Sequence, residues 1–422
     1  MKREIDIDAY LYFGYIPNKR ECSILRRIVG WLEACKDRRL AYRQMAYRQL
    51  LEKGIEAFRS AVMSMVGRST RLHVVPLSGG YDSRLILAEL LRLGLRDQVV
   101  AVTFGTPKTL DYEIGGLVAR KLGVRHEYIN LEKTAISREG LVQTIRTGAR
   151  WTFAFDAYFN SLVKMKFGSD ATYWSGFMGG ASAGSHLRPQ PTSTWEEAKE
   201  YFVRANRFGT FQLHRSGWNP LDVLPEKPYC EKAILDFDDQ LNFDIRQEDA
   251  IYNIVVGAWG DVKTPFYSHD WITFSLSLPR HYRLDRTLFV DMVVKAYPEV
   301  FSLPTKNTWG LSPTSSQWKL MTRRFAVRTW HEVCRRLLPG LAPPHPMENY
   351  IDFDRAIRER PDLRRLVSDS LESLIERKLV TWVDIKGLWH DHIAGRRRYG
   401  QALRILTSLE MNLQVNDEER TT

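Results

Sequence analysis

The first third of the chain alternates between helical and strand patterns of apolar residues. Over 41–66 the apolar residues recur at helical spacing and predict a helix that ends near Gly67. Short apolar runs at 72–77, 99–104 and 126–131 predict strands, and the stretches 83–93 and 112–122 between them predict helices. Strands that alternate with helices predict an α/β fold in which a parallel sheet is flanked by helices.

The rest of the chain is first less regular and then helical. Residues 195–267 are rich in aromatic residues and prolines, and beyond 343–344 the pattern is helical, most clearly over 362–379 and 401–413. We expect 416–422 to fray, and the prolines of 337–346 predict a connector. The predicted parts are a linker-like N-terminal segment with a helix (1–66), a core (67–336) and a helical C-terminal region packed on the core (337–422).

A glycine-rich turn joins the first predicted strand to the helix that follows it. Its sequence is Leu77-Ser78-Gly79-Gly80-Tyr81-Asp82-Ser83. A strand that runs into such a turn brings backbone N–H groups and hydroxyls to a helix N-terminus, where the positive end of the dipole favours an oligophosphate. Asp82 is then placed to hold a divalent cation. Ligands of a parallel sheet bind beyond the carboxyl ends of its strands, where this turn lies.

The pattern Ser-Gly-Gly-x-Asp-Ser resembles the pyrophosphate-binding loop of the ATP pyrophosphatase, or PP-loop, families. It differs from the P-loop, which requires Gly-Lys-Ser/Thr after a longer glycine-spaced stretch. The resemblance implies that ATP is cleaved between its α and β phosphates and that an oxygen is adenylylated. A Ser-Gly-Gly turn that only caps a helix is the alternative.

The composition is typical of a folded globular protein. The chain has 422 residues, of which 44% are hydrophobic and 26% charged, as in folded globular proteins. No apolar run approaches the ~20 residues of a membrane span, and the N-terminus has no apolar signal region, so we expect a cytoplasmic protein. The four cysteines are scattered and suggest neither a zinc site nor disulfides. The net charge of +11 fits anionic substrates, and its even spread argues against nucleic acid.

With these elements placed, nearly the whole chain resembles the synthetase domain of the asparagine synthetase family. Residues 5–17 resemble the family's linker into that domain, and Thr103-Phe104-Gly105 with Asp111 and 118–126 resembles its second strand and helix. Residues 175–184 resemble its glycine-rich second nucleotide loop. Three later blocks, 270–279, 306–310 and 392–410, continue the match in order.

The resemblance implies a role for each matching residue. The adenine and ribose of ATP would be framed by Leu77, Phe104, Gly105, Ser175 and Gly176. The pyrophosphate would be held by Ser78, Gly79, Gly80, Asp82 and Ser83, with magnesium on Asp82. Asp111 matches an aspartate near the phosphates, although an N-cap role is an equal alternative. Lys306 matches a lysine that stabilises the charge of the forming acyl-adenylate, and a solvated loop lysine is its alternative.

Three departures from the family pattern change the expected chemistry. Because residue 1 falls just inside the linker-like segment, we expect no glutaminase domain, and nitrogen would come from ammonia, a separate glutaminase or an amine substrate. Gly180 stands where the family has a second magnesium-binding aspartate, which leaves Asp82 as the obvious acidic ligand. Phe177 replaces a glutamate beside the reacting centre and argues against free aspartate as the substrate.

The sequence therefore predicts an ATP-dependent carbon–nitrogen ligase with ATP and magnesium as cofactors. It would adenylylate a small-molecule or peptide carboxylate, release pyrophosphate, and pass the acyl group to ammonia or an amine. A separate glutaminase or another biosynthetic protein is a candidate partner. The alternatives are a catalytically impaired scaffold or partner subunit, motivated by Gly180, and a tRNA-modifying PP-loop enzyme, motivated by the positive charge.

Overall fold

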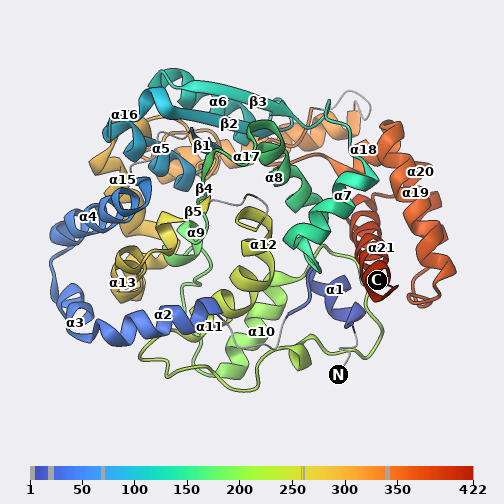
Figure 1. Cartoon of the computed structure of the whole chain (residues 1–422), viewed down its shortest axis with the longest axis horizontal. Helices are drawn as coiled ribbons and strands as arrows, with labels where there is room; N and C mark the ends of the chain where they lie inside the picture. Colours follow the sequence, from blue (N-terminus) through green and yellow to red (C-terminus); the bar gives the residue numbers. More distant parts are fainter. Residues whose placement is uncertain are drawn as a thin grey trace.

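A five-stranded parallel sheet lies at the centre of the molecule (Figure 1). The computed structural model describes residues 5–17, 23–67, 72–257, 259, 262–337 and 343–421. The strands are β1 (His73–Pro76), β2 (Val99–Gly105), β3 (Arg125–Asn130), β4 (Thr172–Trp174) and β5 (Val262–Lys263). Their order is β3-β2-β1-β4-β5. The predicted α/β fold with a parallel sheet flanked by helices is confirmed.

The first three strands and their helices form the predicted β-α-β units. α5 (Asp82–Arg92) connects β1 to β2, and α6 (Leu110–Leu122) connects β2 to β3. α6 ends at Gly123, whose φ of 61° is in the left-handed region that glycine adopts without strain. Val74, Val75 and Val100 are fully buried, because helices cover the sheet and continuous apolar runs suit its strands.

The strand order changes direction at β1. β2 and β3 extend the sheet on one side of β1, whereas β4 and β5 extend it on the other. Such a change of direction opens a crevice at the carboxyl ends of the two strands that flank it. The residues that follow β1 and β4 are the two glycine-containing segments, 77–81 and 175–180. Topology alone therefore brings these segments together.

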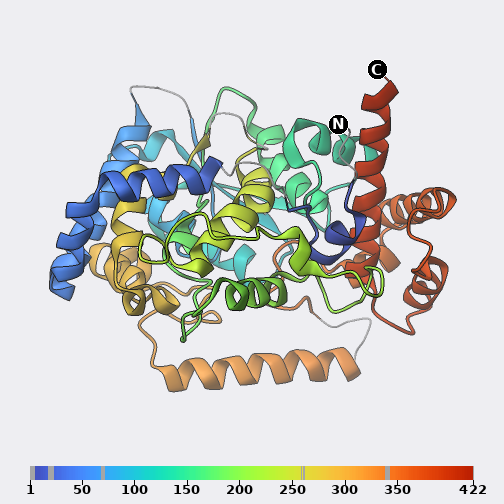
Figure 2. The same ribbon diagram turned by 90° about the horizontal axis from the view of Figure 1, so that it is seen from below.

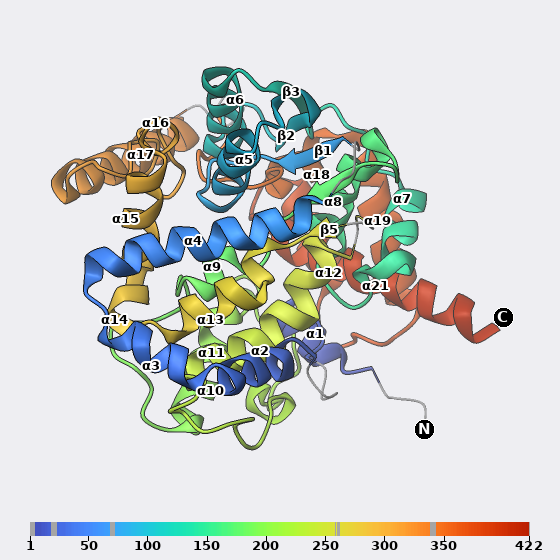
Figure 3. The same ribbon diagram turned by 60° about the vertical axis from the view of Figure 1, so that its left-hand side comes forward.

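Three helices between residues 23 and 66 pack on one side of the core (Figure 3). They are α2 (Ser23–Ala34), α3 (Lys36–Gln44) and α4 (Tyr47–Val66), and they pack with α13 (His269–Ser277) and α15 (Thr287–Ala296). The helix predicted over 41–66 is thus wrong at its start, because α3 and α4 are separated at Met45 and Ala46. Both of these residues have extended backbones that end one helix and precede the next.

The C-terminal helices form a second packed group. α18 (Phe353–Glu359), α19 (Pro361–Glu376), α20 (Ile385–Ile393) and α21 (Gly400–Thr421) share an apolar cluster with α1 (Ile7–Phe13), α7 (Arg138–Thr144) and α8 (Ala154–Phe167). The predicted fraying of 416–422 is wrong up to Thr421. α21 continues through these residues, and Arg150 and Arg377 bind the side chains of Asn416 (2.9 Å) and Asp417 (2.6 Å).

The other α-helices and the longer π-helix belong to the middle part of the chain and to the segments that follow it. They are α9 (Gly179–Ser182), α10 (Trp195–Asn206), α11 (Phe237–Leu241), the π-helix η4 (Asn242–Ile251), α12 (Tyr252–Val255), α14 (Arg280–Arg283), α16 (Pro298–Phe301) and α17 (Gln317–Leu337). Part of the predicted connector, 338–342, lies outside the described residues. No described helix has the length and apolar content that crossing a membrane requires.

Candidate active site

The crevice at the carboxyl ends of β1, β2 and β4 holds a cavity of about 490 Å³. Of the site residues predicted from the sequence, those that line it are Leu77, Ser78, Gly80, Asp82, Ser83, Phe104, Asp111, Ser175 and Gly176. The other three adjoin it, since Gly79 lies between Ser78 and Gly80, Gly105 follows Phe104 at the end of β2, and Lys306 contacts Asp111. The structure therefore brings together residues that lie up to 229 positions apart, from Leu77 to Lys306.

The glycine-rich turn is closed by its own hydroxyls. The Ser78 N–H donates to Ser83 Oγ (3.3 Å), and the Gly80 N–H donates to Ser78 Oγ (3.2 Å). The Gly79 N–H donates to Asp111 Oδ1 (3.0 Å). Three consecutive N–H groups thus each have an oxygen acceptor at hydrogen-bond distance. An arrangement of N–H groups at the start of α5 that already selects oxygen acceptors is suited to phosphate oxygens.

Lys306 is fastened to the glycine-rich turn by its backbone and to Asp111 by its side chain. Its N–H donates to the Gly79 carbonyl (2.9 Å), and its Nζ donates to Asp111 Oδ2 and to Asn349 Oδ1. A Cβ on Gly79 would come within 3.1 Å of Lys306 Cβ and 3.0 Å of the Leu110 carbonyl, so a side chain at position 79 would require these neighbours to shift. The ammonium and the turn therefore share one edge of the cavity.

Arg84 holds the segment that carries Lys306. Its side chain is fully buried in α5, and its guanidinium donates to the carbonyls of Val300 (3.3 Å), Leu303 (3.3 Å) and Pro304 (2.7 Å). Burial lowers the pKa of Arg84 to about 10, which leaves it protonated at neutral pH. The helix that follows the glycine-rich turn thus also fixes the loop that leads into Lys306.

Asp82 is the point where the two loops meet. A Cβ on Gly176 would lie 3.1 Å from Asp82 Cβ, and one on Gly179 would lie 2.6 Å from Asp82 Cγ, so these glycines allow the second loop to approach the carboxylate. Asp82 Oδ1 accepts a hydrogen bond from Arg286. Arg286 is 8% exposed, and its guanidinium lies over the rings of Tyr81 and Phe289 at 5.4 Å and 4.4 Å. Sequence reasoning did not identify this partner.

Arg286 is held in a backbone conformation that costs free energy. Asp285 and Arg286 have φ angles of 52° and 61°, which non-glycine residues rarely adopt. Each such residue costs on the order of 1–3 kcal/mol and persists only where its surroundings enforce it. The cost is consistent with a requirement for the guanidinium at Asp82.

The donor set around Asp82 meets only the minimum for magnesium. Oδ1 accepts a hydrogen bond from Arg286. Oδ2 faces Gly180, and a Cβ on that residue would lie 4.0 Å from it. Among the described residues no group of three or more His, Cys, Asp or Glu side chains could hold a metal ion. One carboxylate suffices for a magnesium ion whose other ligands are phosphate oxygens and water. Asp82 Oδ2 is therefore the protein ligand that such an ion would use.

Aromatic side chains also line the cavity, among them Phe104 and Tyr350. Phe104 at the end of β2 stacks on Tyr350, with ring centroids 6.2 Å apart, and the Tyr350 hydroxyl accepts from Asn160 (3.1 Å). The Tyr350 carbonyl accepts from the Thr106 hydroxyl (2.6 Å), which ties the 345–350 segment to the loop after β2. Gly105 is the last residue of β2 and leads into this loop, and its φ of 150° suits glycine. The two stacked rings offer flat apolar surface.

The second loop starts at Ser175, whose N–H donates to the Lys263 carbonyl (2.9 Å) and whose Oγ accepts from the Phe177 N–H (3.2 Å). Phe177 is 3% exposed and packs edge-on against Tyr252 and Tyr267, with centroids 5.6 Å and 5.9 Å apart. An apolar wall thus stands beside Asp82. A charged substrate group would not be stabilised by this wall.

A second cavity of about 290 Å³ continues from the first. The residues that line both are Ala181, Ser185, Arg246 and Gln247. Arg246 and Gln247 come from the π-helix η4, a rare element that is frequent at functional sites. Arg246 donates to Asn206 Oδ1 (2.7 Å) at the junction of the cavities. A substrate that extends from the first cavity into the second would pass this guanidinium.

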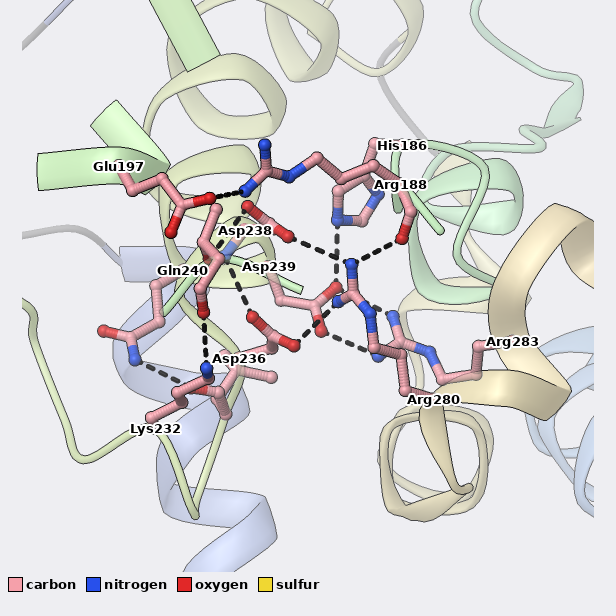
Figure 4. A network of polar contacts seen from close by, with 12 residues as sticks. His186, Arg188, Glu197, Lys232, Asp236, Asp238, Asp239, Gln240, Arg280 and Arg283 are labelled. Atoms are coloured by element: carbon pink, nitrogen blue, oxygen red, sulfur yellow. Dashed lines mark hydrogen bonds and ion pairs between the residues drawn. The ribbon is translucent and has the colours of Figure 1, made fainter. Parts of the chain in front are cut away.

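A network of ion pairs fixes the wall of the second cavity (Figure 4). Arg283 makes two hydrogen bonds with the buried Asp239 (2.7 Å and 2.8 Å), and His186 Nε2 lies 3.0 Å from Asp239 Oδ1. Burial would raise the pKa of Asp239, but Arg283 and His186 outweigh it and hold that pKa below its usual range. Asp238, which lines the cavity, binds Arg280 (3.2 Å).

Several site residues carry no signal in the sequence. Arg246, Arg286, Asn349 and Tyr350 belong to segments without a recognisable motif and reach the cavity only through the fold. Glu348 precedes Asn349 in the chain but is not among the residues that line the cavity. Burial raises its pKa to about 7, with Asp352 adding to the increase and Arg404 and Lys306 opposing it.

Comparison with known proteins does not assign the chain to a family. No protein-family model matches it, and no curated protein is significantly similar to it.

Proposed function

We propose that this protein is an ATP-dependent amide-forming ligase that resembles asparagine synthetase and acts on a carboxylate other than free aspartate. The observation that supports this most strongly is the meeting of the Ser78–Ser83 turn with Lys306 and Asp111 at the edge of a cavity that the stacked rings of Phe104 and Tyr350 also line. The turn suits a pyrophosphate, and the aromatic rings suit an adenine.

In the proposed first step, a substrate carboxylate oxygen attacks the α-phosphorus of ATP. The bond from this phosphorus to the bridging oxygen breaks, and pyrophosphate leaves with the electron pair. The N–H groups of Ser78, Gly79 and Gly80 would bind the leaving phosphates in place of their present acceptors. Magnesium on Asp82 Oδ2 and the phosphates would offset their negative charge. Arg286 adds a fixed positive charge beside Asp82.

In the proposed second step, the nitrogen of ammonia or an amine attacks the acyl carbon. An amide bond forms, the acyl–oxygen bond breaks, AMP leaves, and the nitrogen gives up a proton. Lys306 is positioned to stabilise the negative charge that develops on the acyl and phosphoryl oxygens, provided that Asp111 releases its Nζ. The proton that the nitrogen gives up passes to water.

The side chains that line the cavity indicate which kind of acid could be the substrate. The apolar surface of Phe177 disfavours a second carboxylate next to the reacting centre, whereas Arg246 offers a cation farther away, at the junction with the second cavity. An acid with an anionic or polar group distant from its reacting carboxylate fits both features. Free aspartate, whose carboxylates are close together, fits less well.

A pyrophosphate-release assay tests the proposal. The chain is incubated with ATP, magnesium, ammonia or an amine, and a panel of amino acids, dicarboxylic acids and peptides, with Asp82→Ala as the control. We expect acid-dependent release that Asp82→Ala abolishes. Absence of release with every acid, or equal release by the variant, would overturn the proposal.

One observation favours a second candidate, a non-catalytic relative that acts as a scaffold. Arg286 already neutralises Asp82, and position 180 has no carboxylate, so the fold could persist without metal or nucleotide. Calorimetric titration with ATP and magnesium separates the two candidates. Metal-dependent binding favours the ligase, and absence of binding favours the scaffold.

A further inference from the structure

α17 exposes a row of large apolar side chains to solvent. Five of its apolar residues are between 66% and 74% exposed, namely Trp318, Met321, Phe325, Trp330 and Leu337. Figure 2 shows α17 as the outermost helix on its side of the molecule. Trp318, Met321 and Phe325 are separated by three and four residues, so they lie on one face of the helix. A contiguous apolar surface of this kind marks an interaction site.

The exposed row is separate from the face by which α17 contacts the body. Leu320, Val327 and Cys334 are seven residues apart and are the less exposed apolar positions of the helix, with Cys334 buried. The first three of the five exposed apolar side chains therefore lie on the other side of the helix. At 100° per residue the exposed apolar side chains cover roughly half of the helix circumference. This surface is wider than the narrow apolar stripe by which one helix packs on another in a coiled coil.

The charge of α17 is strongly positive. Its sequence contains six basic residues, Lys319, Arg323, Arg324, Arg328, Arg335 and Arg336, against the single acidic residue Glu332. Arg324 and Arg328 lie over the Trp309 ring at 5.8 Å and 5.2 Å, so some of this charge is anchored to the body. The whole chain is also positive, at +11.

We infer that α17 binds the surface of an anionic membrane, lying in the plane of the interface with its exposed apolar side chains among the lipids. An amphipathic helix with Trp, Phe and Leu on one side and Lys and Arg beside them has the composition of interfacial helices. Two tryptophans strengthen this assignment, because their rings favour the headgroup region. A second copy of the chain is disfavoured as the occupant, since it would bring two such clusters of positive charge together.

The inference is independent of the proposed function, because it uses no residue of the cavity. It predicts a protein that binds to a membrane surface through α17.

Vesicle sedimentation tests it. The full chain is mixed with vesicles of phosphatidylcholine alone or with one-third phosphatidylglycerol. The variant Trp318→Ser/Phe325→Ser removes apolar contact, and Lys319→Glu/Arg323→Glu reverses charge. Met165→Ser is the control for the loss of an exposed apolar side chain elsewhere, because Met165 lies on α8 and is 70% exposed, compared with 73% for Trp318 and 72% for Phe325. Circular dichroism establishes that each variant is folded.

We expect sedimentation with the anionic vesicles only, reduced at least about tenfold in partition coefficient by either double variant and unchanged by Met165→Ser. No sedimentation at low salt would overturn the inference, as would full binding by Trp318→Ser/Phe325→Ser. Analytical ultracentrifugation without lipid provides a further check. Self-association that Trp318→Ser/Phe325→Ser abolishes would show that a second copy covers α17 instead.

Discussion

Asp82 and Arg286 form an ion pair where the two glycine-containing loops meet, 204 residues apart in the chain. The side chain of Arg286 is 10% exposed and that of Asp82 24%, so the pair is only partly open to solvent. Asp82 therefore has a permanent cationic neighbour at the end of the proposed pyrophosphate site. Asp82 Oδ2 itself faces Gly180, a position that lacks a carboxylate.

The first prediction concerns this cation. Arg286→Gln should weaken ATP binding by about tenfold or more, because it removes a charge-assisted contact near the phosphates and frees Asp82 to repel them. Calorimetric titration measures the change. Lys295→Gln is the control, since Lys295 pairs with Glu52 on the exposed surface. Equal affinities of Arg286→Gln and the parent chain would contradict this role.

A second prediction addresses the missing carboxylate. Gly180→Asp should tighten the binding of magnesium-ATP by at least about threefold, because a second carboxylate completes the magnesium donor set next to Asp82 Oδ2. The new Cβ would meet Ser185 Oγ at 3.1 Å, and this exposed hydroxyl can move. Gly180→Asn has the same size without the charge and should give no gain. If both variants tighten binding equally, charge is not the cause.

Lys306 provides a third prediction. Lys306→Gln should lower pyrophosphate release by roughly 10²–10³-fold, while ATP affinity changes by less than about tenfold, because the ammonium acts on charge that develops during the reaction. Lys306→Arg should restore part of the rate. Comparison of the turnover rate with the ATP dissociation constant separates the two effects. A variant that loses affinity and rate together would assign Lys306 to binding alone.

A fourth prediction tests the network of Figure 4. Asp239→Asn should destabilise the fold by about 3–5 kcal/mol, because it leaves the buried Arg283 without its carboxylate. Urea unfolding gives the free energy. Glu52→Gln breaks an exposed pair with Lys295 and should cost at most about 1 kcal/mol. A similar loss in the free energy of unfolding for the two variants would show that the buried pair of Asp239 and Arg283 stabilises the fold no more than an exposed pair.

The raised pKa of Glu348 gives a fifth prediction. The folded state holds the proton of Glu348 more tightly than the unfolded state, whose pKa is near 4.5, so stability falls as the pH rises from about 4.5 to about 7. Glu348→Gln should remove this fall and raise the Tm at pH 8 by roughly 1–3 °C, with no gain at pH 4. Thermal unfolding at the two pH values measures it, and an equal gain at both would exclude titration of Glu348 as the cause.

The core of the sheet was predictable because its signals are local. Apolar runs and the helix that ends at Gly123 fixed the positions of the first three strands and two helices to within about two residues. β5 has only two residues and offers no pattern to detect. The order of β1 and β4 in the sheet depends on long-range packing, which no local window contains.

The same distinction applies to the site. The glycine-rich turn can be recognised in the sequence because a strand, glycines and hydroxyls follow each other directly. Arg286 and Tyr350 cannot be recognised in this way, because they belong to segments more than 200 residues beyond the turn. The resemblance to asparagine synthetase indicated Lys306 but not its contact with Asn349. His186 showed no acidic partner in the sequence, and Asp239 reaches it only through the fold.

The most direct measurement is a calorimetric titration of the chain with ATP and with AMP in the presence of magnesium, repeated on Ser83→Ala. If the turn binds the β and γ phosphates, ATP binds one site per chain at least about tenfold more tightly than AMP, and Ser83→Ala removes most of this difference. ATP that binds no more tightly than AMP, or not at all, would contradict the assignment of the turn and with it the proposed ligase.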